Sequence, residues 1–184
     1  QVCIEKNLRL HLDGARLFNA LVETSESPQD YGKVFDTISI CLSKGLGAPV
    51  GSLLLGSADA IKKARRIRKS MGGGWRQAGF LAAAGIFALE NNIERLKTDH
   101  INAKALGKIL EKASYVKDIL PIDTNIVIFE LEATLSPEVM LRKLAENGIL
   151  AVQFGPAHIR LVTHLEFKSE SLEIFEKVLT QKII

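Results

Sequence analysis

Lys44 is the residue whose sequence surroundings most clearly allow chemistry. It follows the apolar, β-branched run 35–42, which predicts a strand, and it precedes the run 45–51, where glycine and proline predict a tight turn. An amine at such a strand end can be desolvated, and a neutral amine forms imines with aldehydes. The alternative is an ordinary surface lysine at the end of a strand.

Asp13 and Arg16 are candidate partners for such an amine. Both follow the short extended run Leu8–Leu12, and ligands in open α/β sheets lie outside the carboxyl ends of strands. A carboxylate in that crevice could keep a ring nitrogen protonated, which makes a pyridoxal cofactor an electron sink. The alternative is a structural Asp–Arg pair in a turn.

The remainder of the first half predicts the elements that position these residues. We expect a loop over 24–32, a strand over 50–55 and then a basic helix, which the glycines of 71–74 interrupt. An alanine-rich helix follows. Gly79 and Gly85 in this helix each cost about 1 kcal/mol relative to alanine, so they predict that another element passes close by.

The second half predicts a compact α/β unit appended to the end of a larger sheet. Helices and strands alternate in it, with Ser136-Pro137 as a helix start signal. The expected elements are helix 94–112, strand 125–131, helix 136–147, strands 150–153 and 158–162, and a closing helix.

Three segments resemble those of threonine aldolases, which belong to the aspartate-aminotransferase-like fold group of pyridoxal-phosphate enzymes. They are HLDGARLFNA, SKGLGAPVGS and RKSMGGGWRQAG, and the similarity is strongest from His11 to Ala88. The resemblance implies an α/β fold with a mostly parallel sheet that binds pyridoxal 5'-phosphate. Residues 1–92 would then be the carboxy-terminal part of this large domain, and residues 93–184 a small carboxy-terminal domain.

The resemblance also implies roles for individual residues. Lys44 would be the Schiff-base lysine, Asp13 would pair with the pyridine nitrogen, and Ser43 would contact the cofactor. Arg16 would lie near the ring oxygen and the substrate. Arg160, in HIRLVTH, would bind the substrate carboxylate, since a guanidinium can donate two parallel hydrogen bonds to a carboxylate.

Two further basic residues, Lys69 and Arg76, match positions that help to shape the site in this family, toward the cofactor phosphate or across a dimer. The basic run 62–69 to which Lys69 belongs has an alternative reading as a nucleic-acid-binding helix face. It lacks interleaved aromatic residues, so a solvated face near the cofactor phosphate is favoured.

The implied activity is cleavage of L-threonine or L-allo-threonine to glycine and acetaldehyde. A related β-eliminating lyase or aminotransferase would share Asp13 and Lys44, and remains an alternative. The chain opens at Gln1, close to a predicted strand. We therefore expect it to be the carboxy-terminal half of the enzyme and to be inactive without its amino-terminal half. The family forms its sites between subunits, which implies a homo-oligomer, a dimer or a tetramer.

Composition excludes several other classes. The 184 residues are 47% hydrophobic and carry a formal charge of +3, which favours a globular protein with small-molecule partners over nucleic acid. Apolar stretches are too short to span a bilayer, and the two cysteines fit a reducing cytoplasm. The four histidines are not spaced as metal ligands, so no metal is expected.

Overall fold

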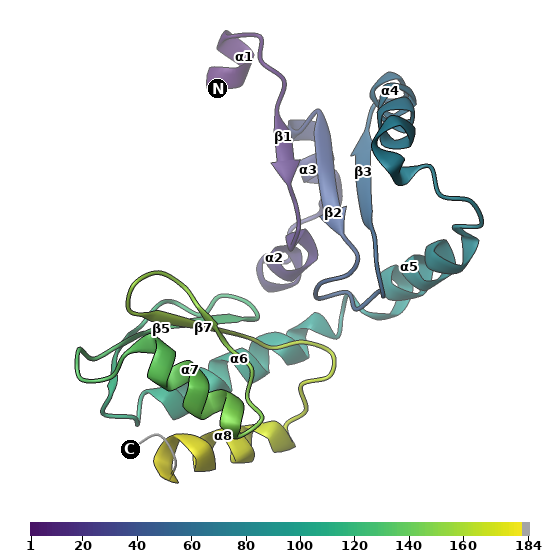
Figure 1. Ribbon diagram of the computed structural model, residues 1–184. Helices are drawn as coiled ribbons and strands as arrows, with labels where there is room; N and C mark the ends of the chain where they lie inside the picture. The colour runs from purple at the N-terminus through teal and green to yellow at the C-terminus, as the bar shows by residue number, and fades with distance from the viewer. Residues whose placement is uncertain (182–184) are drawn as a thin grey trace. The chain divides into compact units, whose positions relative to one another are not determined.

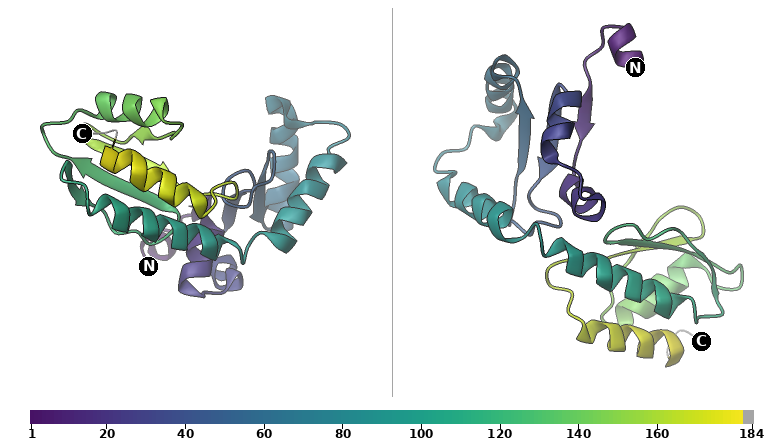
Figure 2. Two further views of the ribbon diagram at one scale, coloured as in Figure 1. Left: turned by 90° about the horizontal axis from the view of Figure 1, so that it is seen from below. Right: turned by 180° about the vertical axis from the view of Figure 1, so that it is seen from behind.

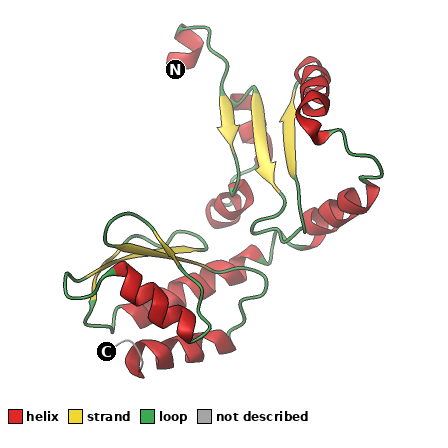
Figure 3. Cartoon of the chain, viewed as in Figure 1, coloured by secondary structure: helices red, strands yellow, loops and turns green. Residues whose placement is uncertain are grey.

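The computed structural model describes residues 1–181 and divides the chain into two compact units, Gln1–Arg95 and Leu96–Ile184. Each unit has a sheet of its own and contains both strands and helices (Figures 1 and 3). The division falls between residues 95 and 96, a few residues after the boundary that the sequence analysis placed at 92.

The first unit contains a three-stranded sheet in the order β1-β2-β3, with β1 parallel to β2 and β3 antiparallel to it. Its elements are α1 (Val2–Glu5), β1 (His11–Asp13), α2 (Leu17–Thr24), α3 (Pro28–Val34), β2 (Thr37–Cys41), β3 (Ser52–Gly56), α4 (Ala58–Arg68), the π-helical turn η1 (Lys69–Gly73) and α5 (Gly79–Asn91).

The described sheet is thus mixed, where the sequence analysis predicted a mostly parallel one. The connections explain the directions of the strands. Helices α2 and α3 form a crossover between β1 and β2, as a parallel pair requires, whereas the short link 42–51 returns the chain antiparallel into β3. All five residues of β3 are exposed.

Helices α2 and α3 cover one face of this sheet, as the view from behind in Figure 2 shows. The buried core there consists of Leu17 and Leu21 from α2 and Ile38 and Ile40 from β2. The prediction of a loop over 24–32 is wrong from Pro28 on, where helix α3 begins. Ser27 Oγ accepts a hydrogen bond from the Gln29 amide and proline occupies the first turn, so a start signal was present.

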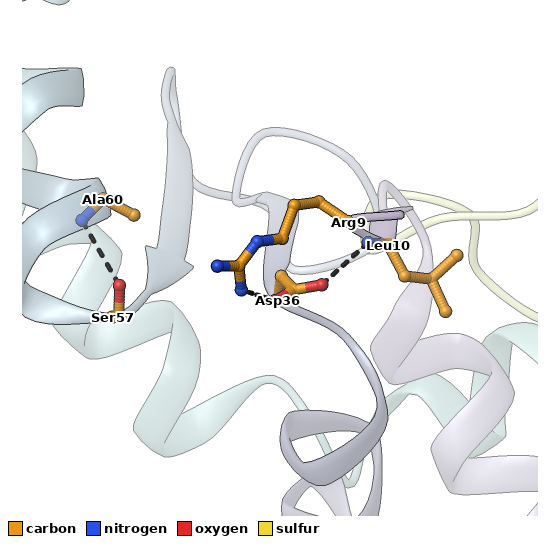
Figure 4. A network of polar contacts seen from close by, with 5 residues as sticks. All are labelled: Arg9, Leu10, Asp36, Ser57 and Ala60. Carbon is orange, nitrogen blue, oxygen red and sulfur yellow. Dashed lines mark hydrogen bonds and ion pairs between the residues drawn. The ribbon is translucent and has the colours of Figure 1, made fainter. Parts of the chain in front are cut away.

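Asp36 fixes the start of β1 beside the start of β2 (Figure 4). Its Oδ2 accepts a hydrogen bond from the Leu10 amide at 2.8 Å, and its Oδ1 pairs with Arg9. These contacts, led by the Leu10 hydrogen bond, hold the pKa of the Asp36 carboxyl below its ordinary value. Its contribution to stability is therefore present above the pKa of the unfolded chain and is lost as the pH falls through the lower folded value.

Helix α4 begins as a capped helix, because Ser57 Oγ accepts a hydrogen bond from the Ala60 amide (Figure 4). The predicted break follows in η1, where Gly72 has a φ of 84°. The prediction of close packing is confirmed at Gly85, where an added Cβ would lie 3.0 Å from Leu42 Cδ1. It is wrong at Gly79, where an added Cβ would meet no atom of the described residues within 4 Å.

The second unit contains a wholly antiparallel four-stranded sheet in the order β4-β5-β7-β6. Sequence reasoning missed β4, a strand with no clear alternation of apolar residues. The elements are α6 (Leu96–Leu110), β4 (Val116–Ile119), β5 (Ile126–Leu131), α7 (Pro137–Glu146), β6 (Val152–Gln153), β7 (His158–Val162) and α8 (Glu170–Gln181).

The helices α6, α7 and α8 cover one face of this second sheet (Figure 1). Strands β5 and β7 alternate between buried and half-buried residues, so every second side chain enters the core beneath the helices. Phe129 and Ile159 are completely buried there. Arg160 follows Ile159 in the strand, and its side chain therefore lies on the face opposite to the helices.

Candidate active site

The carboxyl ends of β1 and β2 meet at one edge of the first sheet, because the two strands are neighbours and parallel. Asp13 is the last residue of β1 and pairs with Ser39 of β2. Lys44 and Ser43 follow the end of β2 on the same side. The structure thus brings a carboxylate, a hydroxyl and an amine, all exposed, to one edge of the sheet.

Gly14 allows the chain to turn tightly between Asp13 and helix α2. Its amide donates to Ser39 O at 2.8 Å, and an added Cβ would lie only 2.7 Å from that oxygen. Asp13 Oδ1 accepts a hydrogen bond from the Ala15 amide at 3.2 Å. Half-buried Arg16 then precedes the first residue of α2, and its carbonyl accepts a hydrogen bond from the Asn19 amide at 3.1 Å. These contacts hold the backbone after Asp13 in place and restrain the Asp13 carboxylate at the end of β1.

Lys44 lies on a turn whose backbone is well anchored although its side chain is exposed. Its carbonyl accepts a hydrogen bond from the Gly47 amide at 2.9 Å, and Gly47 has a φ of 72°, a conformation that favours glycine. The Ala48 amide donates to Leu42 O at 3.0 Å. Gly47 therefore allows the backbone conformation that this turn requires.

Arg160 belongs to strand β7 of the second unit. It is half-buried, and the centre of its guanidinium lies 6.0 Å from the centroid of the Phe154 ring, within the range of a cation–π contact. Its Nε is buried and finds no hydrogen-bond partner among residues 1–181. A donor of this kind is suited to a ligand that brings its own acceptors.

Lys69 and Arg76 do not join the β1–β2 edge within the first unit. Lys69 opens η1 and Arg76 lies on the connection to α5, and both are exposed. Figure 1 shows this segment beyond β3, away from the carboxyl ends of β1 and β2. Helix α4 before it has no buried residue, as a solvated basic face requires.

The donor set at the edge fits an aldehyde cofactor with a basic ring nitrogen. An exposed lysine amine can bond to an aldehyde carbon, and an exposed carboxylate can pair with a protonated ring nitrogen. Within the described chain, no group of three or more histidine, cysteine or acidic residues could hold a metal ion. No described helix is long and apolar enough to cross a membrane.

Comparison with known proteins identifies the family. The family model described as beta-eliminating lyase matches residues 1–134. The chain belongs to this family. It is 45% identical over 172 residues to the low specificity L-threonine aldolase of Escherichia coli O157:H7, and 39% identical over 167 residues to low-specificity L-threonine aldolase 1 of Arabidopsis thaliana. These alignments cover 91% and 89% of this chain, but 49% and 47% of those relatives.

This member of the beta-eliminating lyase family therefore spans about half the length of the curated relatives it matches. The predicted homology to low-specificity threonine aldolases is confirmed. Solved structures agree on the α/β fold. A Leishmania major threonine aldolase matches 99% of the chain with a TM-score of 0.77 at 24% identity, over 54% of its own chain. An ornithine aminotransferase from Toxoplasma gondii matches 99% with a TM-score of 0.65 at 19% identity, over 44% of its own chain.

Proposed function

We propose that this protein is a pyridoxal-phosphate-dependent carbon–carbon lyase that cleaves L-threonine or L-allo-threonine to glycine and acetaldehyde. The observation that carries the proposal is the meeting of Asp13 and Lys44 at one sheet edge, at the ends of two neighbouring parallel strands. The names of the relatives at 39% and 45% identity support the substrate.

In the proposed site, Lys44 Nζ holds the aldehyde carbon of the cofactor, and Asp13 keeps a proton on its pyridine nitrogen. The bound cofactor supplies an electron sink for the pair released when the Cα–Cβ bond breaks. Arg16 and Ser43 contact the cofactor at the same edge. Arg160 binds the substrate carboxylate with two hydrogen bonds and so orients the bond that is cleaved.

The wider setting is also a proposal. Residues 1–92 form the carboxy-terminal part of a larger, mostly parallel cofactor-binding domain, and residues 93–184 form the small domain. Lys69 and Arg76 serve the cofactor phosphate or a neighbouring subunit, in a cytoplasmic homo-oligomer. Exposed apolar side chains support further partners for the first unit, since Leu54 is 45% and Phe80 88% exposed.

Product analysis tests the activity directly. The product of the whole natural reading frame, loaded with pyridoxal phosphate, should release equal amounts of glycine and acetaldehyde from L-threonine or L-allo-threonine. Ammonia with a 2-oxo acid would indicate a β-eliminating lyase instead, and amino transfer to an added 2-oxo acid would indicate an aminotransferase. Either result in place of aldol cleavage would contradict the proposal.

Arg160→Lys should separate substrate binding from cofactor binding. Lysine keeps the charge but cannot make the paired hydrogen bonds, so we expect KM for threonine to rise about 10- to 100-fold. The absorbance of the bound cofactor should stay as in the parent. Arg142→Lys is the matched control, because Arg142 lies on the exposed side of α7 near Glu146. An unchanged KM in Arg160→Lys would remove Arg160 from the site.

A further inference from the structure

Asn92 fastens the turn that carries Lys44. It is the residue that ends helix α5, it is only 9% exposed, and its side-chain Nδ2 donates a hydrogen bond to Leu46 O at 2.7 Å. The two residues are 46 positions apart in the sequence. A short, buried hydrogen bond between distant segments restrains the backbone that it reaches.

Two other contacts connect the same stretch of chain to α5 and to the residues that follow it. Arg95 Nη1 donates to Gly45 O at 3.4 Å, and Leu42 packs against the backbone at Gly85. Leu46 itself is 3% exposed. The turn from Lys44 to Gly47 is therefore supported from α5 and from the residues that follow it.

Lys44 depends on this support, because its own side chain is exposed and carries the amine on a flexible four-carbon stem. The part of Lys44 that the fold places is therefore its Cα, which the turn holds just after the end of β2. A loss of the Asn92 hydrogen bond would also leave the buried Leu46 carbonyl without this donor.

We propose that Asn92 is a positioning residue that presents Lys44 to the cofactor aldehyde. The proposal rests on the proposed role of Lys44, and it adds a residue that acts through the backbone of the turn and touches no reactant. Asn92 should therefore affect how fast Lys44 reacts, with little effect on how the substrate carboxylate is bound.

The neighbouring Asn91 provides a matched control. Its Nδ2 also donates to a backbone carbonyl, that of Phe87 at 2.9 Å, but Asn91 is exposed and this bond lies within its own helix. Asn91→Ala and Asn92→Ala thus remove the same chemical group from adjacent positions. Asn92→Asp replaces the donor by an acceptor of the same shape, and Asn92→Gln restores a donor on a longer arm.

The first readout is amide hydrogen exchange across 45–48 in the product of the whole reading frame, without cofactor. We expect Asn92→Ala and Asn92→Asp to exchange about 10- to 100-fold faster there, while the core strands of the second unit keep the parent rate. Asn92→Gln should recover part of the protection. Equal exchange at 45–48 in Asn92→Ala and Asn91→Ala would overturn the proposal.

The second readout is the reaction of Lys44 with an aldehyde. Reductive methylation by formaldehyde, followed by peptide mass analysis, and the rate at which pyridoxal phosphate absorbance shifts should both change in Asn92→Ala. We expect turnover of threonine to fall about 10-fold or more with KM within about twofold of the parent. A rise in KM with unchanged turnover would contradict a positioning role.

The two hypotheses fail in different ways. If the parent protein does not cleave threonine, the proposed activity is wrong, but exchange at 45–48 and Lys44 labelling still measure the support of the turn. If the parent is active and neither readout changes in any Asn92 variant, the positioning role is wrong. If Asn92→Ala fails to fold, the comparison of Asn92→Gln with Asn92→Asp decides the question.

Discussion

Lys44→Ala is expected to abolish covalent attachment of pyridoxal phosphate and to reduce threonine cleavage by about 10³-fold or more. The reason is that in the proposed site this amine would hold the aldehyde carbon of the cofactor, so its removal would take away the covalent attachment that the proposed activity requires. Lys44→Arg should be as inactive, because a guanidinium keeps the charge but does not become a neutral nucleophile.

Borohydride reduction of the loaded protein measures this prediction. Peptide mapping should find the pyridoxyl label on Lys44, and neither Lys44 variant should carry it. Lys33→Ala is the control, since Lys33 is an exposed lysine of the same unit that pairs with Asp30. Label on a different lysine, with Lys44 unmodified and its variants active, would transfer the role elsewhere.

Local signals in the sequence were enough to predict much of the fold. Strands β2, β5 and β7 lie within or at their predicted ranges because β-branched and apolar residues dominate them. The start of α7 was found from Ser136 and Pro137, and Ser136 Oγ does accept a hydrogen bond from the Val139 amide. The same signal is present at Ser27 and Pro28, but other turn-forming residues surround it and favour a loop. Helix α3 was therefore not predicted.

Strand direction was less accessible than strand position. Nothing in residues 52–56 says that β3 runs antiparallel to β2, because direction depends on how the chain returns through 42–51. Glycine posed a similar difficulty. Gly79 and Gly85 share one helix and one composition, yet only Gly85 has Leu42 close to it.

The candidate site divides in the same way. Asp13, Ser43 and Lys44 could be grouped from sequence, because each lies at or just after the end of a recognisable strand and parallel strands end at a common edge. The role of Asn92 could not be predicted in this way, since the side chain of an asparagine at a helix end usually forms hydrogen bonds with the backbone of its own helix. Its bond to Leu46 O joins segments 46 residues apart and becomes visible only in three dimensions.

Asp13→Asn should lower threonine turnover by about 10²- to 10³-fold while the cofactor remains attached to Lys44. Its proposed role is electrostatic: a carboxylate keeps the pyridine nitrogen protonated and so favours electron withdrawal into the ring, whereas a neutral amide does not. The structure makes this substitution discriminating. Asp13 Oδ1 accepts a hydrogen bond from the Ala15 amide, and the carbonyl oxygen of asparagine can accept the same bond.

Asp13→Asn thus removes the charge and preserves the turn, while Asp13→Ala removes both. An electronic role predicts that both variants lose turnover, with the thermal stability of Asp13→Asn near that of the parent. A role in the turn alone predicts near-normal turnover in Asp13→Asn and reduced stability only in Asp13→Ala. Asp30→Asn, at an exposed aspartate of α3 in the same unit, controls for the loss of one negative charge. Turnover, the absorbance of the bound cofactor and thermal unfolding of the four proteins decide between these roles.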